Sequence, residues 1–145
     1  MTLFRSERTA VHLVTVLEEM PVQETVDGIA DLRAAGLPVG GVVVNLVRRR
    51  DLDDEQLDLI RAGEVDRQEV GATLGQAGVD VDPRLVDALV AEGADHAERR
   101  SLEDAQREVV AGLGVPTYEL PRIASGVDLT GLYELAAELR RQGLA

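Results

Sequence analysis

The chain has 145 residues and a formal net charge of −12 at pH 7, which argues against binding to nucleic-acid phosphates or to anionic membranes. It contains no cysteine, so disulfides, thiol catalysis and Cys-based zinc sites are excluded, and aromatic residues make up only 2%. The one basic cluster, Arg48–Arg50, is followed at once by acidic residues and is predicted to be a solvated loop. We find no signal peptide and no apolar run long enough to cross a bilayer, so we expect a single cytoplasmic domain over residues 1–145.

The first elements along the chain are predicted to form a strand–helix–strand unit. Residues 10–17 (AVHLVTVL) predict a strand, and apolar residues from Val22 onward fall at helical spacing until Gly36 ends the helix. The valine-rich stretch 42–47 predicts a second strand that is buried on both faces. We expect these two strands to be parallel and adjacent.

Residues 51–112 are predicted to be a helical insertion within the domain. Asp53, with Gln56 three residues later, resembles a capping box and predicts a helix over 53–62. A shorter helical piece is expected near 66–77.

Two more helices are predicted before the insertion ends. Asp82 as N-cap and Pro83 at the first helical position predict a helix that starts at residue 83, and Gly93 is predicted to end it. Another helix is expected over about 96–111.

The end of the chain is predicted to add one strand, over 117–121, and one helix, over about 128–142. Apolar residues at helical spacing share one face of that last helix; they are Leu129, Leu132, Ala136 and Leu139. The whole pattern is typical of an α/β domain with a parallel sheet of about three strands and flanking helices.

Asn45 is the first candidate for a ligand-binding residue, because it ends the valine strand and open α/β sheets bind ligands beyond the carboxyl ends of their strands. From spacing alone, a strand-ending asparagine that forms a turn is the alternative. The chain has no lysine, which excludes a P-loop within it. The GLPVGG stretch runs from helix into strand, so Gly40 and Gly41 are predicted to be close-packing or turn glycines rather than a dinucleotide fingerprint.

The segment VHLVTVLEEMPVQETVDGIADLRAAGLPVGGVVVNLV resembles the later part of the anion-transporting ATPases. These are the arsenite-pump (ArsA-like) and tail-anchored-protein-targeting ATPases of the deviant-Walker P-loop class, and LEEMPVQET resembles their actinobacterial branch. Three matches come in the family's order: a strand leading to Glu24–Thr25, the valine strand ending in Asn45, and a strand ending Leu120–Pro121 before the helix start Gly131–Leu132. The resemblance covers nearly the whole chain and implies a partial P-loop NTPase (Rossmann-like) sheet.

In that family, the asparagine that ends the valine strand hydrogen-bonds the adenine base, and the loop after the last strand lines the same pocket. The resemblance therefore implies that Asn45 reads the base and that Pro121 and Arg122 wall the pocket. A carboxamide carries a donor and an acceptor side by side, which matches the amino group and ring nitrogen of adenine. ATP is the implied cofactor, bound weakly or not at all by this chain alone, and Mg²⁺ is implied only together with the N-terminal half.

The family's P-loop, switch regions and catalytic aspartate precede the segment that opens this chain. The resemblance thus implies the C-terminal, adenine-side part of an ATPase, which does not hydrolyse ATP by itself. The implied partner is the missing N-terminal half or a homologous subunit in a homo- or hetero-dimer, because the strand over 11–16 would have an open edge. Two alternatives remain open: a stand-alone, non-enzymatic protein-interaction module on a half Rossmann-like fold, and a small-ligand-binding Rossmann-like domain without ATPase history.

Overall fold

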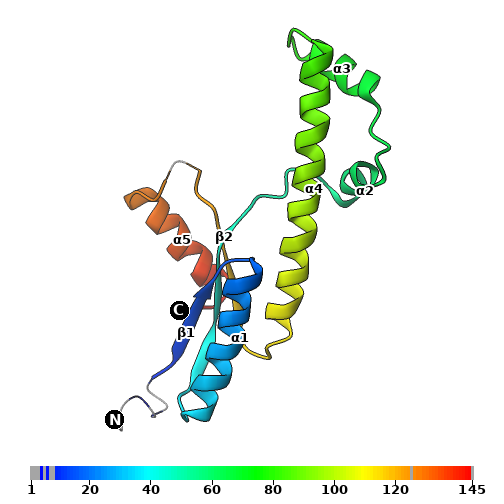
Figure 1. The fold of residues 1–145 in the computed structure, drawn as a ribbon. Coiled ribbons are helices and arrows are strands. Elements are labelled where there is room, and N and C mark those ends of the chain that lie inside the picture. Colours follow the sequence, from blue (N-terminus) through cyan, green and yellow to red (C-terminus); the bar gives the residue numbers. More distant parts are fainter. Residues whose placement is uncertain (1–3, 5, 7–8, 125, 145) are drawn as a thin grey trace. The chain divides into compact units, whose positions relative to one another are not determined.

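The computed structural model describes residues 4, 6, 9–124 and 126–144 (Figure 1). The elements follow one another as β1 (Val11–Thr15), α1 (Glu19–Ala34), β2 (Val39–Val47), α2 (Asp54–Ala62), α3 (Arg67–Gln76), α4 (Pro83–Ala111), β3 (Thr117–Pro121) and α5 (Leu129–Arg141). Two compact units can be distinguished, one made of Met1–Arg49 with Glu103–Ala145 and the other of Arg50–Leu102. Helix α4 contributes residues to both units.

The first unit contains a three-stranded parallel sheet in the order β1-β2-β3, which confirms the predicted α/β fold. The central strand β2 is the most deeply buried of the three, and Val42 and Val44 are 0% exposed. Val43 points to the opposite face and is also buried. A continuous β-branched run fits this position, because a central parallel strand is covered on both of its faces.

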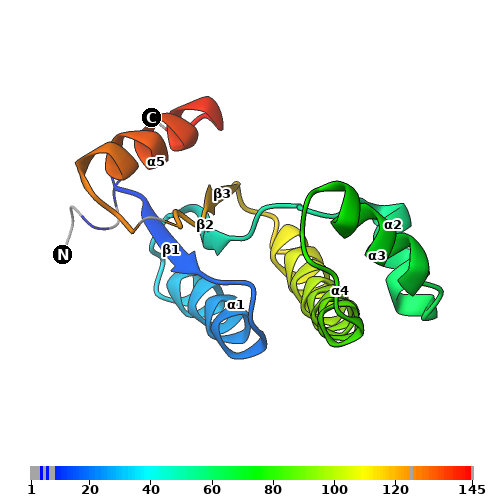
Figure 2. The same cartoon turned by 90° about the horizontal axis from the view of Figure 1, so that it is seen from above.

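Helices cover both faces of the sheet, with α1 and the carboxyl-terminal end of α4 on one face and α5 on the other (Figure 2). Both crossovers, from β1 to β2 and from β2 to β3, step across the sheet in the same direction. Because crossovers between parallel strands are right-handed, two crossovers in the same direction place their helices on the same face of the sheet. The core on that face is formed by Leu17, Val22, Ile29, Val42, Val44 and Val110.

Helix α1 begins at Glu19, three residues before the predicted start at Val22. Pro21 lies in its first turn, where the missing amide proton breaks no helical hydrogen bond. A proline in the first turn is therefore compatible with the helix.

The capping box predicted for α2 is present. The Oδ1 atom of Asp53 accepts a hydrogen bond from the backbone N–H of Gln56 at 2.8 Å, and the Gln56 Oε1 accepts from the backbone N–H of Asp53 at 3.0 Å. The short helix expected near 66–77 is α3.

The prediction of two helices over residues 83–111 is wrong, because α4 is a single helix of 29 residues that passes through Gly93. Its start is as predicted, with the Asp82 Oδ1 accepting from the backbone N–H of Arg84 at 2.6 Å. A glycine inside a helix costs only about 1 kcal/mol relative to alanine.

Among the described residues, no helix combines the length and the apolar character needed to cross a bilayer.

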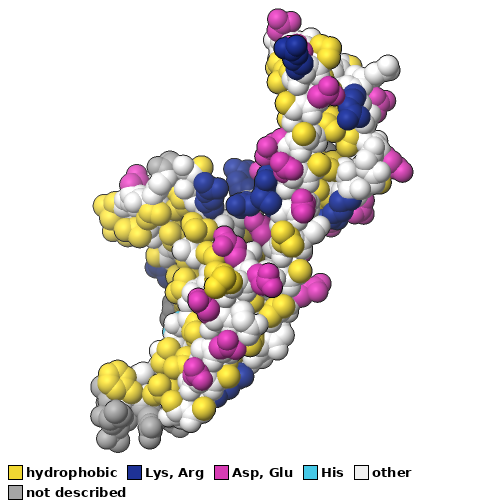
Figure 3. Space-filling view, viewed as in Figure 1, with side chains coloured by type: hydrophobic (Ala, Val, Ile, Leu, Met, Phe, Trp, Pro, Cys, Tyr) yellow, Lys and Arg dark blue, Asp and Glu magenta, His cyan; other side chains and the backbone are white. Residues whose placement is uncertain are grey.

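Helix α5 forms where it was predicted, but its apolar face is largely uncovered. Leu129 and Leu132, which lie on this face, are 68% and 54% exposed. Tyr133 beside them is 67% exposed. Apolar side chains gather over this part of α5 in the space-filling view (Figure 3). The helical period identified the apolar face correctly, while only part of that face packs against β3.

Candidate cavity at the strand ends

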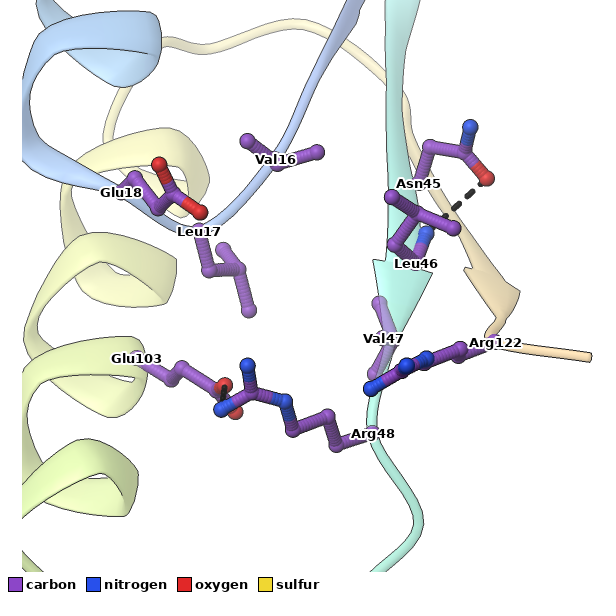
Figure 4. Close-up of a pocket in the computed structure, with 9 residues that line it drawn as sticks. All are labelled: Val16, Leu17, Glu18, Asn45, Leu46, Val47, Arg48, Glu103 and Arg122. Atoms are coloured by element: carbon purple, nitrogen blue, oxygen red, sulfur yellow. Dashed lines mark hydrogen bonds and ion pairs between the residues drawn. The ribbon is translucent and has the colours of Figure 1, made fainter. Parts of the chain in front are cut away.

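A cavity of about 440 Å³ lies at the carboxyl ends of the strands in the first unit (Figure 4). Its walls come from the chain just after β1, the end of β2, the residue after β3, and α4. This is the edge at which open α/β sheets bind ligands. The volume falls within the range of about 300–1,000 Å³ that is typical of small-molecule sites.

Asn45 lies at the tip of β2, half-buried in the wall of this cavity. Its Oδ1 accepts a hydrogen bond from the backbone N–H of Leu46 at 2.9 Å. The Asn45 side chain makes no other hydrogen bond with the described residues, so the Nδ2 group keeps both of its donors for a ligand.

Strand β2 carries an extra residue directly after Asn45. Val44 pairs with Glu119 and Val47 pairs with Pro121, so one more residue separates the pair on β2 than on β3. Such a bulge bends the strand locally and re-aims neighbouring side chains. Leu46, inside the bulge, has a φ of 58°, and no other described non-glycine residue has a positive φ.

Two arginines approach the cavity from different strand ends. Nη1 of Arg48 lies 3.2 Å from Oε1 of Glu103 on α4. The backbone N–H of Arg122 donates to the carbonyl of Val47 at 2.8 Å, while its guanidinium makes no hydrogen bond or ion pair with any described residue. In Figure 4, the Arg122 side chain extends toward Arg48, and the Asn45 carboxamide points away from the Arg48–Glu103 pair. Arg122 therefore offers an unpaired planar cation, a group that can stack on an aromatic ring or bind an anion.

Two of the three site residues named from the sequence, Asn45 and Arg122, line the same cavity. Pro121 instead lines a neighbouring hollow of about 270 Å³, together with Arg49 and Glu138. The Asn45 side chain stands at a strand tip and not in the packed interior, as a ligand-binding role requires.

Leu46, Arg48 and Glu103 also line the cavity, and sequence reasoning had assigned none of them to a site. Arg48 had been assigned to a solvated loop, although its place directly after a strand tip could have suggested a site. Glu103 carried no such signal, because it lies inside a long helix and only the tertiary fold brings it to Arg48.

None of the residues that line the cavity is a serine, threonine, cysteine or histidine. Among the residues that the structure describes, no three His, Asp or Glu side chains come together to hold a metal ion.

No family model matches the chain. It is 40% identical over 142 residues to ATPase BagA of Mycobacterium tuberculosis strain H37Rv. The same identity relates it to a protein of Mycobacterium bovis and to one of Mycobacterium tuberculosis strain CDC 1551, whose names also contain the word ATPase. Each match covers 98% of this chain but only 42% of the relative. Over nearly its whole length the chain is thus related to proteins named ATPases, and it spans less than half of their length.

Proposed function

We propose that the chain is the adenine-side, C-terminal part of an anion-transporting ATPase of the ArsA-like family, and that it holds the base of ATP while another part grips the phosphates. The observation that carries the proposal is the cavity at the strand ends, with Asn45 and Arg122 among the residues that line it. The 40% identity to proteins named ATPases supports ATP as the nucleotide. The motifs around Glu24–Thr25 and Leu120–Pro121 support the choice of family.

The chemistry of the two side chains suits an adenine base. The Asn45 Nδ2 can donate to a ring nitrogen, while Oδ1 has a second lone pair that can accept from the exocyclic amino group. The guanidinium of Arg122, which has no partner among the described residues, can lie flat against the ring. Without the phosphate and Mg²⁺ contacts, the base alone supplies little affinity, so we expect weak binding and no hydrolysis by this chain by itself.

Uncovered apolar surface supports the second half of the proposal, that a further part belongs on this unit. Val14 on β1 is 67% exposed, and β1 has no hydrogen-bonded neighbour on its outer side among the described residues. The exposed leucines of α5 add to this surface. Large exposed apolar patches mark interaction surfaces in soluble proteins. We propose that the N-terminal half of the ATPase, or a homologous subunit, covers them.

An NMR titration of the ¹⁵N-labelled chain with millimolar ATP tests the nucleotide site. We expect shifts in the backbone amides of Asn45, Leu46 and Arg122, and an affinity lower by about tenfold in Asn45→Ala, since one paired hydrogen-bonding group is worth about 1–1.5 kcal/mol. Gln76→Ala, in α3, is the matched control and should bind as the unchanged chain does. Equal binding by Asn45→Ala would remove Asn45 from the site, and ATP that leaves all three amides unmoved would refute the proposed function.

A further inference from the structure

We infer that the second unit, Arg50–Leu102, carries a binding site of its own for a small amphiphilic amine, a molecule with an apolar body and one protonated amino group. The site is a cavity of about 400 Å³ between α2, α3 and α4. This volume lies within the range of about 300–1,000 Å³ that is typical of small-molecule sites. The cavity at the strand ends, where a nucleotide is proposed, shares no lining residue with it.

The walls of this second cavity are mostly apolar. Figure 1 shows α2 and α3 beside the first half of α4, which is where the cavity lies. Gly93 of α4 lines it without a side chain to fill the space. The aliphatic side chains in its walls are Leu52, Ile60, Val65, Val70, Leu89 and Val90. Such walls fit the apolar body of a ligand.

The second unit buries few apolar side chains of its own. Its buried hydrophobic residues are Leu57, Val86 and Ala97, all among the described residues, and α3 has no buried residue. The aliphatic residues of the cavity walls are half-buried or exposed, and Leu89 is 46% exposed. A ligand that removes this apolar surface from water gains free energy by the hydrophobic effect.

Three polar side chains line the same cavity, and each of them can accept a hydrogen bond: Asp51, Glu92 and His96. A carboxylate is an acceptor only, and a neutral imidazole has one acceptor nitrogen. The half-buried His96 ring makes no hydrogen bond or ion pair with any described residue. An ammonium group has three donors and no acceptor, so it matches these side chains.

The charge of the second unit also favours a cation. The unit has fourteen Asp and Glu residues and six Arg, so it carries −8 of the chain's net charge of −12. A carboxylate or phosphate head group would meet like charge there, whereas an ammonium group is attracted. Glu92 Oε1 lies 3.0 Å from Nη2 of Arg99, but both side chains are exposed, and such a pair contributes little. Oε2 of Glu92 has no partner among the described residues and is left to accept from the ligand.

Decylamine, decanol and decanoate have the same apolar chain and differ in their head group. Each is titrated into the ¹⁵N-labelled chain below the concentration at which it forms micelles. We expect decylamine to shift the backbone amides of Val65, Gly93 and His96, and to leave those of Asn45 and Leu46 in place. Its affinity should exceed that of decanol by about tenfold, and decanoate should bind more weakly still.

Two variants test the charged and the apolar part of the site separately. Glu92→Gln should lower the affinity for decylamine by about fivefold and leave that for decanol unchanged. Glu55→Gln is its matched control, because Glu55 is an exposed residue of the same unit outside this cavity, and it should change neither affinity. Val70→Phe should fill the cavity and weaken binding of all three probes. Val79→Phe, at an exposed position that does not line the cavity, should weaken none.

Failure of decylamine to shift any of the three amides would overturn the site. Equal affinities for the three probes, or tightest binding of decanoate, would overturn the preference for an amine. If Val70→Phe does not fold, the comparison of Glu92→Gln with Glu55→Gln still decides, since both positions are exposed and their replacement leaves the packing intact. An unchanged decylamine affinity in Glu92→Gln would contradict the role of that carboxylate.

Discussion

Gly40 and Gly41, at the start of β2, lie so close to neighbouring atoms that there is no room for a side chain at either position. A Cβ on Gly41 would lie 2.6 Å from the carbonyl oxygen of Pro116, and a Cβ on Gly40 would lie 2.5 Å from the Nε2 of His12. Contacts this short are not found for real Cβ atoms, so something must move. At Gly40 the obstacle is the end of a side chain, whereas at Gly41 it is backbone.

Gly41→Ala should therefore destabilise the protein by about 1–3 kcal/mol, the usual cost of overpacking. Urea denaturation would show this as a lower midpoint with an unchanged slope. Gly93→Ala is the matched control: its new Cβ would meet the Cδ1 of Ile60 at an ordinary 3.6 Å. Because alanine is the better helix former, Gly93→Ala should stabilise by about 0.5–1 kcal/mol. Equal midpoints for Gly41→Ala and the unchanged chain would contradict the close approach.

At the strand tip, the sequence predicted the position of Asn45 but not the bulge beside it. Asn45 follows a run of valines, and local pattern alone places it at the end of a strand. Leu46 and Val47 continue the apolar run, so nothing in the local pattern marks a left-handed residue. The bulge depends on how β2 registers against β3, and that partner lies far away in the sequence.

Among the elements, α2 was predictable to its ends because its capping signals are local, whereas the continuity of α4 was not. Gly93 was taken as a stop signal for the helix. Ending a helix and starting another requires a new nucleus, which is costlier than one interior glycine. A glycine therefore does not end a helix where helix-forming residues continue on both sides of it.

One side chain of the segment after α5 covers the outer edge of β3 at Glu119. The Gln142 Oε1 accepts from the backbone N–H of Glu119 at 2.7 Å, and its Nε2 donates to the Glu119 carbonyl at 2.7 Å. These two hydrogen bonds reproduce what a further strand would supply. Pro121, at the end of β3, has no amide proton to offer.

Gln142→Leu should remove both of these hydrogen bonds and lower the free energy of unfolding by about 1–2 kcal/mol. Hydrogen exchange of the Glu119 amide should become faster, since the amide loses its acceptor. Arg140→Leu, at an exposed neighbouring position, is the control and should leave that exchange rate unchanged. A Glu119 amide that exchanges at the same rate in Gln142→Leu would show that the side chain does not close this edge.

The Gln142 side chain is itself held by Glu138, whose Oε1 accepts from the Gln142 Nε2 at 2.5 Å. The side-chain hydrogen bond from Arg141 holds the pKa of Glu138 below its ordinary value, and the bond from Gln142 acts in the same direction. The pKa of Glu138 is lower in the folded chain than in the unfolded chain. Its carboxylate therefore contributes fully to the free energy of unfolding at pH values above the ordinary pKa of a glutamate. That contribution is lost as the pH falls through the pKa of the folded chain.

The side-chain ¹⁵N resonance of Gln142 should therefore titrate with a midpoint below the ordinary pKa of a glutamate. Arg141→Leu removes the main cause of the shift and should raise the midpoint. In Glu138→Gln the titration should vanish. A midpoint at or above the ordinary value in the unchanged chain would contradict the pairing.

For the whole molecule, the sequence predicted the α/β fold class and the parallel pairing of the first two strands, but it did not indicate what covers the apolar face of α5. Helical periodicity shows which face of a helix is apolar but not what covers it. Leu129, Leu132 and Tyr133 satisfy the pattern of a buried face and yet stand exposed. The exposure fits a chain that spans only 42% of its relatives.

We expect the isolated chain to associate through this surface, in a manner that depends on concentration. Sedimentation velocity should show a dimer that weakens when Leu132→Glu and Tyr133→Glu are combined, because two charges would have to be buried. Leu85→Glu, on α4 in the second unit, is the control and should leave association unchanged. Monomer at every concentration would contradict the proposed interaction surface.

Gln142 also bears on a different mode of assembly, in which copies pair through the open edge of β1 and not through α5. Because the Gln142 side chain occupies the outward backbone groups of Glu119 on β3, a further strand can be added more readily at the edge of β1. Two copies that join β1 to β1 across a two-fold axis would have the β3 edge, covered by Gln142, at each end of the joint sheet. Growth therefore terminates after a single addition. If the edges of β1 and β3 were both open, the same chain could add copies without limit and form fibres.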